Sequence, residues 1–229
     1  MSSYDAFAPV YDAWSGHMTE DVDFYVSLAA EATGPIVELA VGNGRVAVPI
    51  VERTGNRLIG IDLSPAMLEG ARARAAAARV ELDLRLGDMR NLALEAQTDL
   101  VICPFRSLLH VERRQHPDVF RRVFDALRPG GRFAWNAFVF DPAVAAEIGG
   151  AWRVQNGVRH RVDYDFDERR LDLTLDGGAT VPLWWVNRDE WDAAIDGAGL
   201  EVEALYGWFD RRPFDDESRE FVYVARRPA

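Results

Sequence analysis

The segment that decides the fold class of this chain is Ile36-Val37-Glu38-Leu39-Ala40-Val41-Gly42-Asn43-Gly44-Arg45. Its apolar beginning is typical of a buried strand, and its glycines fall where a tight turn leads into a helix-like segment. Glycine lets the backbone approach a ligand closely, and the N-terminus of a helix presents unpaired N–H groups. A strand, a glycine turn and a helix in this order predict a cradle for a nucleotide cofactor, with the acidic Glu38 inside the strand.

Strand-like and helix-like segments alternate on both sides of this turn. We expect helices at 4–14 and 20–31, separated by Gly16 and His17, and further helices at 45–53, 64–78 and 116–127. Strands are expected at 36–41, 57–63, 80–86, 99–103 and 132–139. Ser64 is the expected N-cap of its helix and Pro65 the first helical residue. The alternation predicts a parallel sheet with right-handed crossovers and helices on both faces.

The pattern changes after Asp141-Pro142, where apolar and polar residues begin to alternate. Period-two alternation at 158–166, 171–175 and 181–186 predicts antiparallel strands. A helix at 188–198 and strands at 200–209 and 220–225 follow. The predicted fold class is therefore α/β, Rossmann-like, with a seven-stranded, mostly parallel sheet and a small antiparallel insertion after the fifth strand.

We interpret residues 1–229 as one domain in four parts. Residues 1–33 form an N-terminal helical lid and 34–141 the cofactor-binding core. Residues 150–187 form the insertion that covers the substrate, and 188–229 the last helix and strand pair.

The composition limits the partners of the protein. Among 229 residues the formal net charge is −11, which disfavours nucleic acid because binding to phosphates needs basic patches. Cys103 is the sole cysteine, so no internal disulfide is possible. We see neither a signal peptide nor an apolar run long enough to cross a membrane, and we expect a cytoplasmic protein without a membrane partner.

The glycine turn alone leaves two cofactor classes open, because Gly42 and Gly44 followed by Ala47 also fit the dinucleotide fingerprint of dehydrogenases. Asp62 ends the next strand, where a carboxylate can accept hydrogen bonds from both ribose hydroxyls of either cofactor. Asp88 ends the strand after that, where a carboxylate can accept a hydrogen bond from an adenine amine.

Glu38, the glycine turn, Asp62, Asp88 and the turn Pro129-Gly130-Gly131, in this order, resemble the class I S-adenosylmethionine-dependent methyltransferases. The resemblance covers most of the chain. Its start, with Tyr4-Asp5 and Tyr11-Asp12, looks like the N-terminal helix of small-molecule N-methyltransferases of the sugar-amine and glycine type. The other matching segments are 61–68, 107–111 and 208–214.

The resemblance implies S-adenosylmethionine as cofactor and S-adenosylhomocysteine as product. Glu38 would order the glycine turn or contact the methionine ammonium, Asp62 would hold the ribose, and Asp88 would accept from the adenine amine. Ala40 departs from the family pattern, in which many members carry glycine. The implied cofactor-binding residues are Tyr11, Glu38, Ala40, Gly42, Asn43, Gly44, Arg45, Asp62, Leu63, Met67, Asp88, Met89 and Cys103.

The chemistry follows from methyl transfer as an in-line displacement, in which the protein mainly aligns the reactants. His110 follows the fourth strand at the ligand-binding edge of the sheet and is the candidate base, and Tyr4 and Tyr11 are further catalytic candidates. The expected substrate contacts are Phe105, Arg106, His110, Trp152 and His160. We expect no metal ion, and we interpret the thiol of Cys103 as core packing.

Several functions stay open at this level. We favour transfer of a methyl group to an amine nitrogen of a small molecule, with O- or C-methylation as alternatives. An NAD(P)-binding oxidoreductase and a non-catalytic S-adenosylmethionine-binding protein are the others. The chain contains no lysine, which excludes a lysine-dependent dehydrogenase. The antiparallel insertion is a candidate contact for a homodimer.

Overall fold

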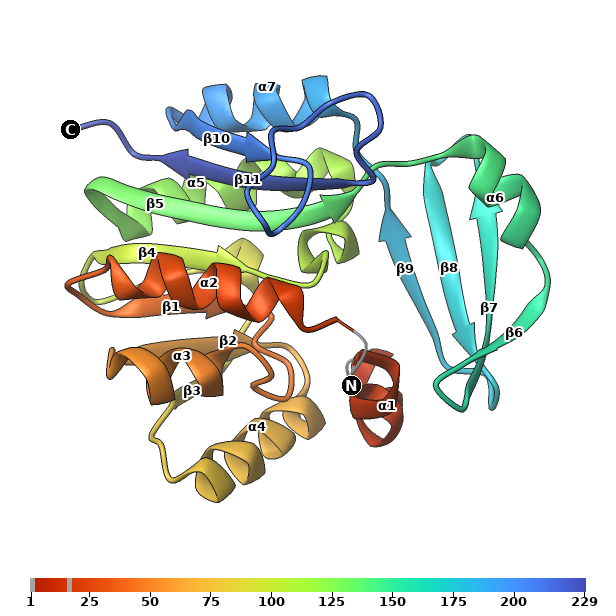
Figure 1. Cartoon of the computed structure of the whole chain (residues 1–229), viewed down its shortest axis with the longest axis horizontal. Helices are drawn as coiled ribbons and strands as arrows, with labels where there is room; N and C mark the ends of the chain where they lie inside the picture. Colours follow the sequence, from red (N-terminus) through yellow and green to blue (C-terminus); the bar gives the residue numbers. More distant parts are fainter. Residues whose placement is uncertain (1–2, 16–17) are drawn as a thin grey trace.

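The computed structural model describes residues 3–15 and 18–229, so Gly16 and His17, which we expected to separate two helices, lie outside the described residues. Its larger sheet has the strand order β10-β11-β5-β4-β1-β2-β3 (Figure 1). The strands are β1 (Ile36–Leu39), β2 (Leu58–Asp62), β3 (Asp83–Leu86), β4 (Thr98–Cys103), β5 (Leu127–Phe138), β10 (Glu201–Tyr206) and β11 (Glu220–Arg226). The predicted seven-stranded Rossmann-like sheet is confirmed.

The first five strands pair in parallel, and β11 and β10 add antiparallel strands at one edge. On one face of the sheet, the core includes side chains of α2 (Glu20–Ala30), α3 (Ala47–Thr54) and α4 (Pro65–Ala78). On the other face it includes α5 (His116–Ala126) and α7 (Arg188–Ala198). Because β1 to β5 run in the same direction, their carboxyl ends meet at one edge, where ligands bind in open α/β sheets.

Local sequence signals explain where the element that follows β2 begins. The Ser64 hydroxyl accepts a hydrogen bond from the Met67 backbone N–H at 3.1 Å, and Pro65 occupies the first helical position of α4. This is the N-cap that the sequence predicts. Gly130 of the Pro-Gly-Gly turn lies inside the bounds of β5 instead of before it, because its N–H donates to Arg227 O at 2.9 Å beside β11.

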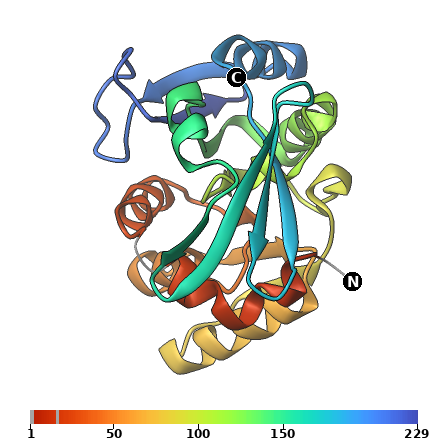
Figure 2. The same cartoon turned by 90° about the vertical axis from the view of Figure 1, so that its right-hand side faces the viewer.

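A smaller antiparallel sheet stands beside the carboxyl edge of the larger one (Figures 1 and 2). Its strands are β6 (Trp152–Gln155), β7 (Val158–Asp165), β8 (Arg170–Leu175) and β9 (Thr180–Trp184), preceded by α6 (Pro142–Ile148). The insertion after the fifth strand is therefore confirmed, with β6 and α6 as elements that the sequence did not predict. The four residues of β6 alternate between apolar and polar, but the strand is short and its side chains are largely exposed, so it has no buried face.

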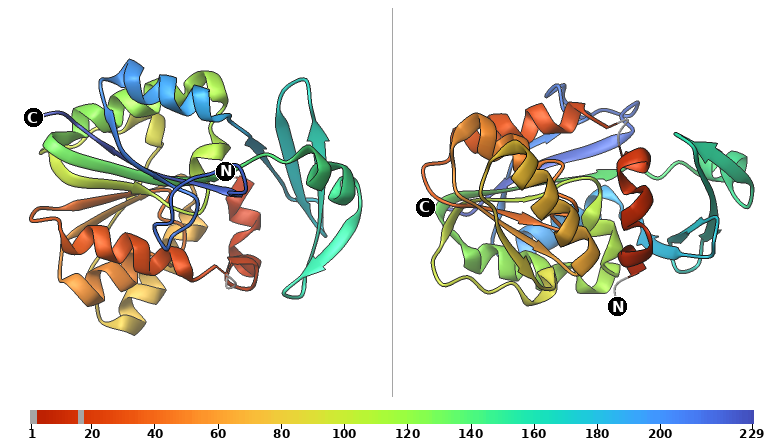
Figure 3. Two further views of the ribbon diagram at one scale, coloured as in Figure 1. Left: turned by 45° about the horizontal axis from the view of Figure 1, so that its top comes forward. Right: turned by 90° about the horizontal axis from the view of Figure 1, so that it is seen from below.

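The N-terminal segment lies between the two sheets in both views of Figure 3. The expected helix 4–14 is divided into η1 (Ser3–Ala6), η2 (Ala8–Val10) and α1 (Tyr11–Ser15), with Pro9 lacking the N–H that a continuous helix would use. Phe7 is 1% exposed and packs in a cluster with Met67 of α4 and Val181 of β9. The segment thus joins the core to the smaller sheet directly above the carboxyl edge.

Candidate functional site

A cavity of about 180 Å³ opens at the carboxyl edge, under the N-terminal segment. It is lined by Tyr4, Tyr11, Ala40, Gly42, Ile61, Asp62, Leu63, Met67, Gly87, Met89, Phe105, Ser107, His110 and Pro182. Ten of these are residues that the sequence singles out, and they come from five separate segments of the chain. A larger hollow of about 520 Å³ between α5, α7 and β9 has none of the predicted site residues in its lining.

The glycine turn after β1 is tied to the end of β2 through Asp62. One carboxylate oxygen accepts from Gly42 N–H and the other from Ser64 N–H, each at 2.8 Å. Burial raises the pKa of Asp62, and the backbone N–H donors oppose that rise in part. Gly42 has φ +56°, a left-handed conformation that favours glycine, whereas a Cβ there would meet the Tyr11 ring only at an ordinary contact distance of 3.9 Å.

Ala40 stands at φ +54°, in the left-handed region that favours glycine. The family pattern has glycine at this position in many members, and the geometry explains that preference. An alanine methyl is tolerated, at the cost of backbone strain of about 1 kcal/mol.

Glu38 lies beneath the glycine turn and is 2% exposed. Its Oε2 has no hydrogen-bond partner within the described parts of the chain. Burial raises its pKa, with Arg45 opposing that rise. A buried carboxylate oxygen without a partner is costly unless a ligand or water satisfies it, so this residue fits a cofactor whose ammonium is held nearby.

His110 is fixed by hydrogen bonds on both ring nitrogens. Nδ1 lies 2.9 Å from the carbonyl oxygen of Pro182, which can only accept, so Nδ1 carries the proton. In the neutral ring Nε2 then accepts from the Tyr4 hydroxyl at 2.6 Å. Burial lowers the pKa of His110 to about 4, despite the opposing contact with Pro182. The ring is thus neutral at neutral pH, and its Nε2 lone pair is held by the Tyr4 hydroxyl, which belongs to the same cavity wall.

Aromatic rings form one wall of the cavity. The Tyr4 and Tyr11 rings lie 6.4 Å apart edge to face, and Tyr11 meets Phe105 at 6.1 Å. Burial is the main cause that raises the pKa of both Tyr4 and Tyr11, so both are phenols at neutral pH. The Arg45 guanidinium lies 4.8 Å from the centre of the Phe105 ring.

Some predicted cofactor residues do not line the cavity. Asp88 forms an ion pair with Arg90, whose Nε lies 2.9 Å from both carboxylate oxygens. Burial raises the pKa of Asp88, but these hydrogen bonds outweigh it and leave the pKa lowered. Arg45 binds Asp21 bidentately at 2.6 and 2.7 Å, so it anchors α2 to the glycine turn. Asn43 donates to Asp12 at 2.6 Å and so holds α1.

The remaining predicted residues are also set back from the cavity. Gly44 is absent from the lining. Cys103 is fully buried, and burial raises the pKa of its thiol, which fits a side chain of the core. Of the expected substrate contacts, Trp152 lies on β6 under Arg159, at 4.7 Å, and His160 packs edge to face on Trp14 at 4.7 Å. Neither reaches the cavity lining.

Sequence reasoning missed Ile61, Gly87, Ser107 and Pro182 as lining residues. Ile61 and Gly87 adjoin the predicted Asp62 and Asp88, so an extension of those motifs would have found them. Pro182 comes from the middle of an inserted strand, and only the docking of β9 against His110 brings it to the site.

The stability of the fold should depend on pH through His116, a buried histidine outside the cavity. It is 3% exposed, stacks on Trp191 and donates from Nε2 to Leu108 O at 3.0 Å, and burial lowers its pKa to about 4. The unfolded chain therefore takes up the proton first, and the stabilisation present above pH ~6.5 is lost as pH falls towards 4. The free energy of unfolding, measured by urea titration, should fall between pH 7 and pH 4 in the wild type. In His116→Gln this fall should be smaller by about 2 to 3 kcal/mol. Equal losses in the two proteins would contradict this.

Within the described segments, no helix is long and apolar enough to span a membrane, and no group of three or more His, Cys, Asp or Glu side chains is placed to hold a metal ion.

Comparisons with known proteins agree with this geometry. Residues 36–131 match the family model described as a methyltransferase domain. The structure of the CcbJ methyltransferase from Streptomyces caelestis is similar, with a TM-score of 0.81 and 28% identity over 97% of this chain and 96% of that one. The 27-O-demethylrifamycin SV methyltransferase of Amycolatopsis mediterranei is 28% identical over 78% of this chain and 67% of its own length.

The fold is also that of the glycopeptide N-methyltransferase MtfA in complex with S-adenosylmethionine, with a TM-score of 0.67 at 20% identity over 91% of this chain and 93% of that one. Among curated relatives, the chain spans between 40% and 79% of the relative's own length. The domain match, the likeness to CcbJ over nearly the whole chain and the cavity at the carboxyl edge agree. Residues 36–131 therefore match a methyltransferase domain, and the chain as a whole is similar to S-adenosylmethionine-dependent methyltransferases.

Proposed function

We propose that this chain transfers a methyl group from S-adenosylmethionine to an amine nitrogen of a small molecule, with His110 as the proton acceptor. The observation that carries the proposal is that His110 lines the same cavity as Asp62 and has an unprotonated Nε2, which now accepts from the Tyr4 hydroxyl. Asp62, which would hold the ribose, and His110, which would act as base towards the acceptor, then line the same cavity.

The cofactor fits the residues at the carboxyl edge. Asp62 has lone pairs left for ribose hydroxyls after accepting two backbone N–H groups, and Leu63 and Met67 offer apolar surface to adenine. The buried, unpartnered Oε2 of Glu38 would be satisfied by the methionine ammonium or by a water beside it. S-adenosylmethionine supplies a methyl group on a cationic sulfur, which leaves as a neutral thioether.

Proton handling favours nitrogen over an alkyl hydroxyl. A histidine whose pKa is lowered to about 4 by burial is too weak a base to form an alkoxide. A neutral amine is already nucleophilic, so it needs only a hydrogen-bond acceptor that orients its lone pair and takes its proton. Nε2 of His110 fills that role, and the Tyr4 phenol that now occupies it would move aside or bridge to the amine.

The walls of the cavity also suit an amine. The rings of Tyr4, Tyr11 and Phe105 present aromatic surface, which favours ammonium-like groups. One relative named above acts on an N-acceptor and another on an O-acceptor, so their names leave N- and O-methylation both open. O-methylation of an acidic hydroxyl is the second candidate. A homodimer through the insertion, a metal-free reaction and a cytoplasmic location stay predictions.

A thermal-shift titration tests the cofactor. S-adenosylhomocysteine at about one hundred times its Kd should stabilise the native state by about 2.7 kcal/mol and raise the Tm by about 5 to 10 °C. NADH at the same concentration should leave the Tm unchanged. A shift with NADH and none with S-adenosylhomocysteine would overturn the proposal.

A further inference from the structure

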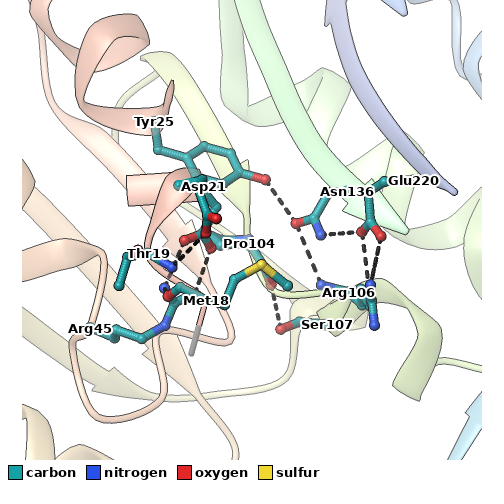
Figure 4. Close-up of polar contacts among 11 residues, drawn as sticks. Met18, Thr19, Asp21, Tyr25, Arg45, Pro104, Arg106, Ser107, Asn136 and Glu220 are labelled. Atoms are coloured by element: carbon teal, nitrogen blue, oxygen red, sulfur yellow. Dashed lines mark hydrogen bonds and ion pairs between the residues drawn. The ribbon is translucent and has the colours of Figure 1, made fainter. Parts of the chain in front are cut away.

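A buried polar network lies beside the cavity without lining it (Figure 4). Glu220, at the start of β11, is 0% exposed and accepts from Arg106 Nη2 at 2.7 Å and from Asn136 Nδ2 at 2.7 Å. Asn136 of β5 in turn accepts from the Tyr25 hydroxyl of α2 at 3.0 Å. Both Asn136 and Tyr25 are 0% exposed. A buried charge in this setting must be paired and hydrogen-bonded, and Glu220 meets both conditions.

The network ends on an unusual turn after β4. Phe105 and Arg106 follow each other with φ +57° and +61°, in the left-handed region that bulky residues rarely adopt. Such a backbone persists only where the surroundings hold it. Asn136 Oδ1 lies 3.5 Å from Arg106 N, and Glu220 holds the guanidinium through two of its nitrogens, Nε and Nη2.

This turn determines where two parts of the cavity wall lie. Phe105 is itself a wall residue, and the residue after Arg106 begins η4 (Ser107–His110), which ends on the candidate base. The Ser107 hydroxyl and N–H both donate to Pro104 O, at 2.7 and 3.2 Å, and these bonds tie η4 to the turn.

We infer that Glu220 is a positioning residue that acts through Arg106. Its buried carboxylate fixes the Phe105–Arg106 turn and thereby places Phe105 and η4 against the reacting part of the cavity. This inference rests on the proposed function and adds residues of β5 and β11 to its site.

A pair of cofactor analogues provides the test. S-adenosylhomocysteine has sulfur without a methyl group, whereas sinefungin carries an amine that projects where the transferred methyl would be. The ratio of the two Kd values therefore reports on the wall around the methyl position. In Glu220→Gln we expect sinefungin affinity to fall about tenfold, because small displacements of positioning groups have large effects, while S-adenosylhomocysteine affinity stays within about twofold.

The control is Glu203→Gln, the same substitution at a strand residue whose ion pair with Arg132 lies away from the cavity, and it should change neither affinity. The double variant Glu220→Gln with Arg106→Met should match Arg106→Met alone, because Glu220 acts through Arg106. Should Glu220→Gln fail to fold, Arg106→Lys keeps the charge but loses the planar fork and should show the same change in ratio.

An unchanged ratio in folded Glu220→Gln or Arg106→Lys overturns the inference, as do additive effects in the double variant. If the wild type binds neither analogue, the proposed function fails, and this inference fails with it.

Discussion

Replacing Asp62 with alanine is expected to abolish the thermal stabilisation by S-adenosylhomocysteine. The carboxylate lines the cavity and also ties Gly42 N–H to Ser64 N–H, so its loss removes the ribose contacts and loosens the glycine turn. Hydrogen bonds to a charged group contribute about 1.5 to 3 kcal/mol each, so affinity should fall about a hundredfold or more. Calorimetric titration of both proteins measures the difference.

Asp83→Ala is the matched control. Asp83 begins β3 at the opposite edge of the sheet, where it pairs with Arg57 and Arg85 near the surface. Its loss should leave the affinity for S-adenosylhomocysteine unchanged. A folded Asp62→Ala variant that binds as tightly as the wild type would show that the cofactor is held elsewhere.

Replacing His110 with alanine is expected to slow turnover about a hundredfold or more while leaving S-adenosylhomocysteine affinity within about threefold. The acceptor loses the hydrogen-bond acceptor that Nε2 provides, whereas the cofactor contacts at Asp62 stay in place. The measurement is kcat with an amine acceptor, found by following release of S-adenosylhomocysteine. Asp83→Ala, at the opposite edge of the sheet, should leave kcat unchanged.

The pH dependence gives His110 a second test. A base must be unprotonated to act, and burial lowers the pKa of His110 to about 4. The limb of the rate profile that belongs to His110 should therefore lie near pH 4, and any limb at higher pH belongs to the acceptor amine. An acidic limb near the ordinary histidine value of about 6.5 that disappears in His110→Ala would contradict the assigned burial.

Much of the fold could be predicted because its signals are local. The glycine turn after β1, the Ser64-Pro65 start of α4 and the apolar stripe of α5 each specify an element from a few neighbouring residues. The strand β6 was not predicted, because its apolar alternation extends over only four residues and its side chains stay largely exposed. The N-terminal helix was predicted too long, since Pro9 interrupts it.

The candidate site also has features that follow from local sequence and features that depend on tertiary contacts. Asp62 at the end of β2 and Met89 shortly after β3 both line the cavity, because parallel strands bring their carboxyl ends together. The partner of Asp88 could not be read from its position, although Arg90 is only two residues away. The contact between His110 and Pro182 O depends on how the smaller sheet docks, which no sequence pattern specifies.

The most direct test of the account uses S-adenosylmethionine labelled with ¹³C in the methyl group. Wild-type protein and the His110→Ala variant are incubated with a panel of small amines and hydroxyl compounds, and the labelled product is identified by NMR. We predict an N-methyl signal that depends on an amine acceptor, forms with S-adenosylhomocysteine and is greatly slowed in the variant. An O-methyl product, or N-methylation at the same rate in both proteins, would contradict the assignment of nitrogen as acceptor and His110 as base.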